Sequence, residues 1–157
     1  LGRMSGNFLD EVDDLSDTFK FQPFQHGVPQ VFEQATITPY RTVHPTETFA
    51  LRIEDHASGK VIAYSADTAY TEDLVDCARD AEYFLCEAAW GATAADKVSG
   101  MHMSGADAGE LATAAGVRNL VLTHLQPWGD TAATVQAAEN YFAGPVQVAL
   151  PGNEYTL

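Results

Sequence analysis

Hydrophobic and polar positions divide the chain into short apolar runs, separated by turn residues and by segments of helical periodicity. This alternation is typical of buried strands in a sheet that is covered by helices. We expect strands at residues 28–43, 48–53, 61–64, 82–87, 118–124 and 146–150. The pattern therefore predicts an α/β domain, in which a polar loop at residues 54–60 joins two strands as a hairpin.

The segments between the later runs have the spacing of helices. We expect helices at residues 71–79 and 131–142, and one that begins at Ser104 or Gly105 and continues through Ala115. Thr71 and Thr131 suit the first and last of these as caps, because a side-chain oxygen can accept a hydrogen bond from the first helical turn. A short amphipathic helix is also expected around Phe8 to Leu15, in the acidic start of the chain.

Three of the predicted strands lead into residues that can bind metal ions or transfer protons. Asp67, Glu87 and His124 each stand at or just past the end of an apolar run. A strand fixes such a residue while the loop exposes it, so catalytic groups often gather at strand ends. If these three strands run in the same direction, their ends meet at one edge of the sheet, and the three residues are expected to line a single cleft.

Length and composition fit one globular domain. The chain has 157 residues, of which 46% are hydrophobic, and a domain of this size buries roughly 68–70% of its unfolded surface. No apolar run reaches the length of about 18 residues that a membrane span needs, and no signal-peptide core is visible. Because two cysteines, Cys77 and Cys86, are too few for a disulfide framework, both are predicted to be reduced in a cytoplasmic protein.

The net charge of the chain indicates which kinds of ligand it can bind. The chain has 8 basic and 22 acidic residues, a formal net charge of −14. Such a surface repels nucleic-acid phosphates unless basic patches or bound cations intervene, and the basic residues are scattered singly along the sequence. A long nucleic acid is therefore disfavoured, whereas a small anion held by metal ions fits.

Four side chains carry candidate chemistry: His44, Asp67, His102 and His124. Imidazole and carboxylate groups suit Zn²⁺, or Mn²⁺ with more oxygen ligands. None of the histidines forms a close-spaced His-x-His pair. The residues taken alone therefore also allow structural, hydrogen-bonded histidines.

Five sequence motifs, in a fixed order, help to decide between metal-binding and structural histidines. They are His44-Pro45-Thr46-Glu47-Thr48-Phe49, Tyr64-Ser65-Ala66-Asp67-Thr68, Cys86-Glu87-Ala88-Ala89-Trp90, Met101-His102-Met103-Ser104 and Leu122-Thr123-His124-Leu125. Together they resemble the metallo-β-lactamase superfamily, and more narrowly its ribonuclease Z-like branch of phosphodiesterases. The chain from residue 35 to residue 150 is similar to actinobacterial hydrolases of that branch that cleave cyclic nucleotides.

The resemblance implies a role for each motif residue. It makes His44 a ligand of a first metal ion, Asp67 the carboxylate that bridges two ions, and His124 a ligand of the second. His102 would assist departure of the leaving oxygen from the scissile phosphate, and Glu87 would position His102. The resemblance thus implies two divalent ions, with Zn²⁺ expected and Mn²⁺ or Fe as alternatives.

Substrate contacts are predicted from residues beside these motifs, namely Thr68, Ser104 and Trp128. Trp128 and Trp90 each lie just beyond a motif and can stack a base, although packing explains their positions equally well. Ala66 departs from the family, which usually has glycine before the bridging aspartate.

A second departure is larger, because the His-x-His-x-Asp-His motif of the family is absent from residues 1–157. The resemblance then implies the C-terminal half of a single αββα sandwich domain, in which the N-terminal half lies upstream of Leu1. With so few ligands, we expect the isolated chain to be inactive and to associate with itself or with its missing half. A homodimer is the usual form of the family.

The leading functional prediction is a metal-dependent phosphodiesterase. The resemblance implies that a hydroxide bridging two metal ions hydrolyses a small phosphodiester such as 3′,5′-cyclic AMP. One alternative is a ribonuclease Z-type endonuclease that matures the 3′ end of transfer RNA. Another is a binding domain that retains the metallo-β-lactamase fold without catalysis.

Overall fold

A single seven-stranded sheet organises the computed structural model, which describes residues 17–157. Its strands are β1 (Gln30–Val31), β2 (Ala35–Arg41), β3 (Phe49–Asp55), β4 (Val61–Tyr64), β5 (Tyr83–Glu87), β6 (Asn119–Thr123) and β7 (Val146–Val148). Its helices are α2 (Glu72–Ala78), α3 (Gly105–Ala115) and α4 (Thr131–Glu139). The helix expected around Phe8 to Leu15 lies outside the described residues. The α/β prediction is confirmed.

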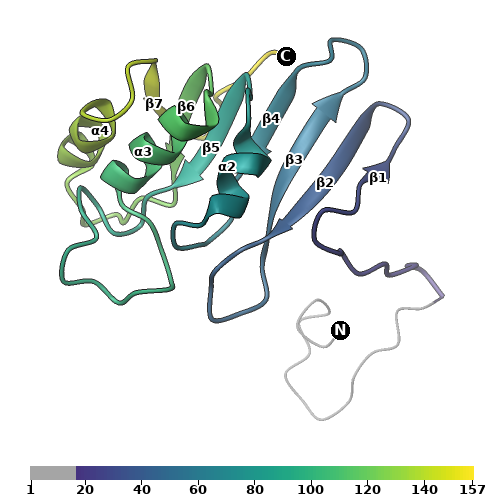
Figure 1. The fold of residues 1–157 in the computed structure, drawn as a ribbon, viewed down its shortest axis with the longest axis horizontal. Helices are drawn as coiled ribbons and strands as arrows, with labels where there is room; N and C mark the ends of the chain where they lie inside the picture. Colours follow the sequence, from purple (N-terminus) through teal and green to yellow (C-terminus); the bar gives the residue numbers. More distant parts are fainter. Residues whose placement is uncertain (1–16) are drawn as a thin grey trace.

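The strands lie in the sheet in the same order as in the sequence (Figure 1). Strands β1 to β4 pair antiparallel, and the β3–β4 pair is the predicted hairpin. Strands β4 to β7 pair parallel, and each crossover between them needs a long connection such as a helix. The C-terminal ends of β4, β5 and β6 therefore meet at one edge of the sheet, as the strand-end pattern predicted.

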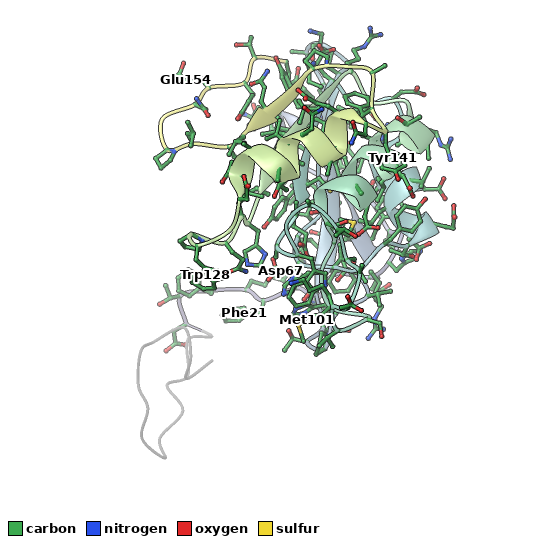
Figure 2. All side chains as sticks on the ribbon, turned by 90° about the vertical axis from the view of Figure 1, so that its left-hand side faces the viewer. Phe21, Asp67, Met101, Trp128, Tyr141 and Glu154 are labelled. Carbon is green, nitrogen blue, oxygen red and sulfur yellow. The ribbon has the colours of Figure 1, made fainter. Side chains whose placement is uncertain are left out.

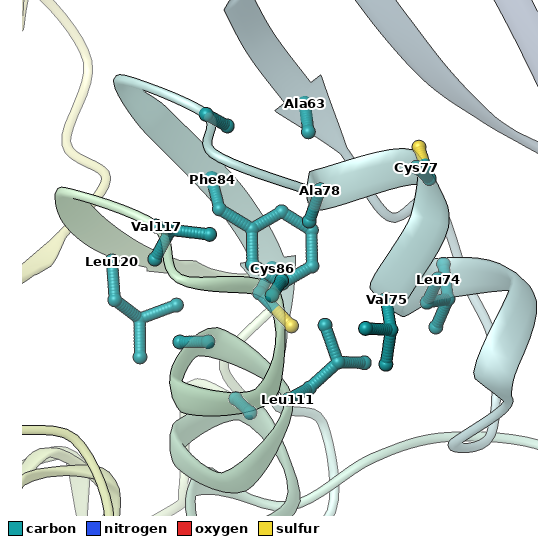
Figure 3. Packing of buried hydrophobic residues seen from close by; sticks show 14 of the residues in the cluster. Ala63, Leu74, Val75, Cys77, Ala78, Phe84, Cys86, Leu111, Val117 and Leu120 are labelled. Atoms are coloured by element: carbon teal, nitrogen blue, oxygen red, sulfur yellow. The ribbon is translucent and has the colours of Figure 1, made fainter.

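One face of this sheet is covered by α2, α3 and α4 (Figure 1). Ala63, Phe84 and Leu120 form one row across β4, β5 and β6, and all three are fully buried on this face. Figure 3 shows Phe84 packed among side chains of α2 and α3, including Leu111. The hydrophobic core thus lies between the sheet and its helices.

The opposite face of the sheet is apolar and partly exposed. Its central row contains Leu51, Tyr64 and Leu85, which pair across β3, β4 and β5. Aromatic residues from outside the sheet contact it: the ring centroids of Phe24 and Phe49 are 5.9 Å apart, and those of Tyr155 and Tyr83 are 5.2 Å apart. Among residues 17–157 no helix covers this face.

Helix ends follow the predicted caps with two corrections. Thr71 occupies the N-cap position of α2, but its side chain makes no capping hydrogen bond. Ser104 and the N3 residue Asp107 form a reciprocal capping box at the start of α3, which ends at Gly116 with φ 67°. Helix α4 is capped by Asp130 rather than Thr131, because the Asp130 carboxylate accepts a hydrogen bond from the Ala133 N–H at 2.9 Å. Helix α4 also ends at Glu139, earlier than predicted.

Two glycines let α3 and α4 approach closely. A Cβ added at Gly105 or Gly109 would overlap the backbone oxygens of Thr134 and Ala138 on α4. Helix backbones can come this close only where no side chain stands between them. In the part of the chain that is described, no helix has the length and apolar character required to cross a bilayer.

Candidate metal centre

All five residues assigned metal or catalytic roles lie at the edge where β2, β4, β5 and β6 end. His44 follows β2, Asp67 follows β4, Glu87 ends β5, His102 precedes α3 and His124 follows β6. The ring centroid of His102 lies 5.5 Å from that of His44 and 5.1 Å from that of His124. The fold therefore brings residues from five separate segments into one cluster.

The donor atoms of this cluster are close enough to share metal ions. One ligand atom each from His44, Asp67 and His102 lies within 4.8 Å of the others, and the same holds for Glu87, His102 and His124. The Asp67 carboxylate is 3.1 Å from Nδ1 of His124, and both side chains are about two-fifths exposed. Imidazole nitrogen and carboxylate oxygen in this arrangement fit a divalent ion.

His44 has one ring nitrogen engaged within its own loop. Its Nδ1 is 2.9 Å from the Thr46 hydroxyl, which fixes the ring orientation in the way that neighbours of metal-binding histidines commonly do. The Nε2 atom of His44 is then the nitrogen that suits a metal ion.

Glu87 is a buried carboxylate with a complete set of hydrogen bonds. Its Oε1 accepts from the Thr68 N–H at 2.9 Å and lies 2.8 Å from Nδ1 of His102, while Oε2 accepts from the Ala89 N–H at 3.0 Å. The side chain is only 1% exposed. Because its oxygens are used in this way, Glu87 orients His102 and is poorly placed to bind a metal ion.

Two predicted substrate contacts are instead buried within the protein. The Thr68 hydroxyl donates to the Ala69 carbonyl at 2.7 Å and accepts from the Val43 N–H at 3.1 Å, which ties the loop before His44 to the loop after β4. The Ser104 hydroxyl is used in the capping box of α3. Both residues are fully buried, so this geometry supports a positioning role and gives no support to substrate contact.

Ser65 is a positioning residue that the sequence analysis did not single out. Its hydroxyl accepts from the Glu87 N–H at 2.9 Å and donates to the Ala66 carbonyl at 2.7 Å. A serine before a motif is too common to signal this role, since the partner lies 22 residues away. Ser65 therefore couples the ends of β4 and β5.

Two loops of this cluster contain strained backbone. Ala66 and His124 have φ values of 52° and 56°, in the left-handed region that non-glycine residues seldom adopt. Such residues persist where the surrounding structure holds them, and they are frequent at functional sites. The glycine that the family usually has before the aspartate matches the conformation that Ala66 adopts here.

Tyr64 stands on the exposed sheet face beside the cluster. Partial burial raises the pKa of its phenol, and the negative charges of Asp67 and Glu87 raise it further. The phenol is consequently a neutral hydrogen-bond donor at neutral pH.

A cavity of about 140 Å³ adjoins the cluster. Trp90, Lys97, Gln126 and Trp128 contribute to its lining. The Trp90 ring packs edge-to-face against His102 at a centroid distance of 5.0 Å. Trp128, one of the predicted substrate contacts, is 83% exposed and stands at the same end of the molecule as Asp67 (Figure 2).

Comparison with known proteins agrees with this fold. The family model of the beta-lactamase superfamily domain matches residues 9–125. The chain therefore belongs to the beta-lactamase superfamily, and its sheet and helices match the metallo-β-lactamase fold.

Several relatives are similar over most of this chain. An uncharacterised protein of Mycobacterium leprae is 38% identical over 157 residues, which cover 100% of this chain and 55% of the relative. The probable metallo-hydrolase YhfI of Bacillus subtilis is 33% identical over 82% of this chain and 52% of its own length. Its crystal structure superposes with a TM-score of 0.74 at 32% identity, covering 83% of this chain and 53% of that one.

A ribonuclease Z of Myxococcus xanthus is 32% identical over 84% of this chain and 41% of its own length. The chain thus spans about half the length of the first of these relatives. The relatives that carry a functional name are a metallo-hydrolase and a ribonuclease, which places this chain in a family of metal-dependent hydrolases.

Proposed function

We propose that the protein is a metal-dependent phosphodiesterase that hydrolyses a small phosphodiester such as 3′,5′-cyclic AMP. The observation that carries this proposal is the pair formed by the buried Glu87 and the partly buried His102, whose atoms are 2.8 Å apart beside Asp67 and His124. A histidine held by a buried carboxylate next to metal ligands is suited to protonate a leaving oxygen. The superfamily assignment supports the hydrolase class.

His44, Asp67 and His124 are the proposed ligands of two divalent ions, with Zn²⁺ expected and Mn²⁺ or Fe as alternatives. Ions bound there would supply activated water and stabilise negative charge on the phosphate. The cluster fits such ions, because ligand atoms of His44, Asp67 and His102 lie within 4.8 Å of one another and the Asp67 carboxylate is 3.1 Å from Nδ1 of His124.

Glu87 and His102 perform the proton chemistry of the proposal. The ionised Glu87 carboxylate accepts a hydrogen bond from Nδ1–H of His102, so Nε2 is the nitrogen left for the substrate. In the imidazolium form, Nε2–H donates its proton to the departing oxygen, and the adjacent carboxylate stabilises the positive charge. His102 is the catalytic residue, and Glu87 is a positioning residue.

A second candidate is an endonuclease of the ribonuclease Z type, which the similarity to the Myxococcus xanthus protein favours. The net charge of −14 argues for a small substrate instead. Salt-dependent binding of transfer RNA would support this second candidate. The third candidate is not an enzyme but a binding domain that retains the fold without catalysis. The amount of bound metal distinguishes it from the two enzyme candidates, because only they need metal ions.

The partner proposal starts from the uncovered sheet face. This face is apolar and carries no helix among the described residues, and the chain spans about half the length of its relatives. We propose that the face packs against a second half of an αββα sandwich, and that the completed domain forms a homodimer. A cytoplasmic location stays a prediction.

The test measures bound metal and cyclic AMP hydrolysis in full-length protein that includes this second half. Two metal ions per chain are expected in the wild type. Asp67→Ala should lose both metal and turnover, whereas His102→Ala should lose turnover and keep metal. His56→Ala is the matched control. His56 lies in the loop between β3 and β4, and its ring nitrogen is hydrogen-bonded to the hydroxyl of Thr36 on β2. Metal without cyclic-nucleotide turnover would favour an RNA substrate, and protein with neither would favour the binding domain.

A further inference from the structure

We propose that the cavity bounded by Trp90 and Trp128 is the subsite for the base of a nucleotide substrate, which Lys97 and Gln126 orient. This inference rests on the proposed function, since it assigns a chemical class to the substrate of the same site. Four properties of the cavity lead to it: its position, its size, its walls and its charge.

The position of the cavity follows from Trp90. Its backbone N–H donates to the Met103 carbonyl at 3.0 Å, so the loop after β5 is fixed to the segment that carries His102. The Trp90 ring meets the His102 ring at 86°. One indole therefore contacts the proposed proton donor and also lines the cavity, so a ligand whose phosphate lies at His102 can extend into it.

The size of the cavity, about 140 Å³, suits one part of a nucleotide. Sites that enclose a whole drug-sized ligand measure roughly 300–1,000 Å³, whereas an apolar cavity of about 150 Å³ accepts a benzene-sized molecule. The space therefore fits a single planar ring system, and the sugar and phosphate would remain outside it, toward His102.

The walls of the cavity favour a planar aromatic ligand. Both tryptophans of the 157-residue chain line it. Trp128 lies in a turn closed by a 2.9 Å hydrogen bond from the Gly129 N–H to the Gln126 carbonyl, and it is 83% exposed. A large apolar ring held in water beside a candidate site is a feature of binding surfaces, and indole is a good stacking surface for any base.

The charge of the cavity differs from that of the whole chain. Although the chain has 22 acidic residues, none of the described residues that line the cavity is acidic. The Lys97 ammonium lies 6.0 Å from the centre of the Trp90 ring. Lys97 and the Gln126 amide offer hydrogen-bond donors to the nitrogen and oxygen acceptors of a base, and the lysine also attracts an anionic nucleotide.

The test titrates metal-free full-length protein with AMP and follows tryptophan fluorescence, so it does not depend on hydrolysis. We expect saturable quenching by AMP and none by ribose 5-phosphate, which lacks the base. Trp128→Leu should weaken AMP binding about tenfold, the scale of one lost stacking contact. Lys97→Gln should weaken binding more than Lys97→Arg. Trp90→Phe and Trp128→Phe assign the signal to each ring.

Tyr141→Leu is the matched control, because Tyr141 is an exposed aromatic residue far from the cavity (Figure 2). Unchanged AMP affinity in Trp128→Leu, equal binding of ribose 5-phosphate, or no saturable quenching would each overturn the subsite. In the metal-loaded enzyme, Trp128→Leu should raise KM for cyclic AMP about tenfold and leave kcat unchanged. Saturable AMP binding without hydrolysis by the wild type would refute the proposed reaction and leave the base subsite intact.

Discussion

Ala66 adopts a left-handed backbone conformation one residue before the proposed bridging carboxylate. The neighbouring residue holds it there: the Ser65 N–H donates to the Leu85 carbonyl at 2.9 Å, and the Ser65 hydroxyl bonds to the Ala66 carbonyl. The strain is therefore supported by the pairing of β4 and β5 and serves to direct Asp67 toward His124.

Ala66→Gly should stabilise the protein. An L-residue in the left-handed region costs roughly 1–2 kcal/mol, and glycine removes this cost while losing more chain entropy on folding. We expect the free energy of unfolding to rise by up to about 1 kcal/mol, measured by urea denaturation. Ala63→Gly, a buried position in regular β4, should lower it. A loss of stability in Ala66→Gly would contradict the strain argument.

Glu87→Gln should separate positioning from metal binding. The amide retains the size of the side chain but removes its charge and replaces one carboxylate oxygen by an NH₂ group, so the hydrogen bonds from Thr68, Ala89 and His102 cannot all be kept. We expect kcat to fall about 10–100-fold while the number of bound metal ions stays unchanged. The control is Glu110→Gln on the exposed surface of α3. Loss of metal in Glu87→Gln would instead make Glu87 a ligand.

Both thiols should be inert in the native state. Burial raises the pKa of Cys77 to about 12 and raises that of Cys86 well above its usual range, whereas an unfolded thiol has a pKa of about 8.5. A thiol-reactive dye at pH 9 should therefore label the protein only after urea unfolds it. Rapid labelling of the native protein would contradict the described burial.

The raised pKa values of the two thiols also make the free energy of unfolding depend on pH. Between about pH 9 and pH 12 the unfolded chain loses thiol protons that the folded chain keeps, so the free energy of unfolding falls as pH rises. The stability difference between wild type and Cys77→Ala should narrow over this range. A difference that stays constant from pH 8 to pH 11 would show that Cys77 does not titrate in this way.

The positions of the site residues could be predicted from the sequence only where a local pattern marked them. Asp67, Glu87 and His124 stand at strand ends, and their convergence follows from parallel strands sharing one edge. The burial of Thr68 and the part played by Ser65 depend on partners such as Val43 and Glu87, distant in sequence. No spacing rule reveals such contacts.

The close contact between helices α3 and α4 depends on small residues. Gly109 lies inside α3, where alanine would normally be favoured by about 1 kcal/mol. Here the added methyl group would overlap the Ala138 backbone on α4, and a backbone cannot rotate away as a side chain can. Packing therefore outweighs helix propensity at this position.

Gly109→Ala should destabilise the protein despite its better helix propensity. Overpacking costs roughly 1–3 kcal/mol, so a net loss of about 1–2 kcal/mol is expected in urea denaturation. Ala114→Ser adds an atom at an exposed position of the same helix and should change stability by less than about 0.5 kcal/mol. A more stable Gly109→Ala variant would show that α3 and α4 are not packed in this way.

Element boundaries were predicted best where a chemical signal marks them. Gly116 ends α3 because glycine adopts positive φ at little cost. The predicted strand at residues 28–43 is instead two strands, β1 and β2, because the chain turns back between Val31 and Ala35. The turn residues Phe32, Glu33 and Gln34 include neither glycine nor proline, so no turn signal in the sequence marks the break.

The uncovered sheet face dominates the behaviour expected of the whole chain. Ile62 and Leu85 lie on it beside Tyr64, whereas the opposite face is sealed by three helices among residues 17–157. Apolar patches of this kind promote association.

The 157-residue chain produced alone should therefore self-associate, as size-exclusion chromatography with light scattering would show. Ile62→Lys should shift it toward the monomer, because a charge on the face opposes its burial. Glu110→Lys, on the side covered by helices, should leave the oligomer unchanged. A monomeric wild-type chain would show that the exposed sheet face does not promote association.

The sheet order that repeats the sequence order also has a consequence for biosynthesis. Each strand pairs only with the strands before and after it in the chain, so no strand waits for a distant segment to be made. On the ribosome, the strands of the sheet can therefore pair in the order in which they are made, and the apolar sheet face would be the surface left for the proposed second half.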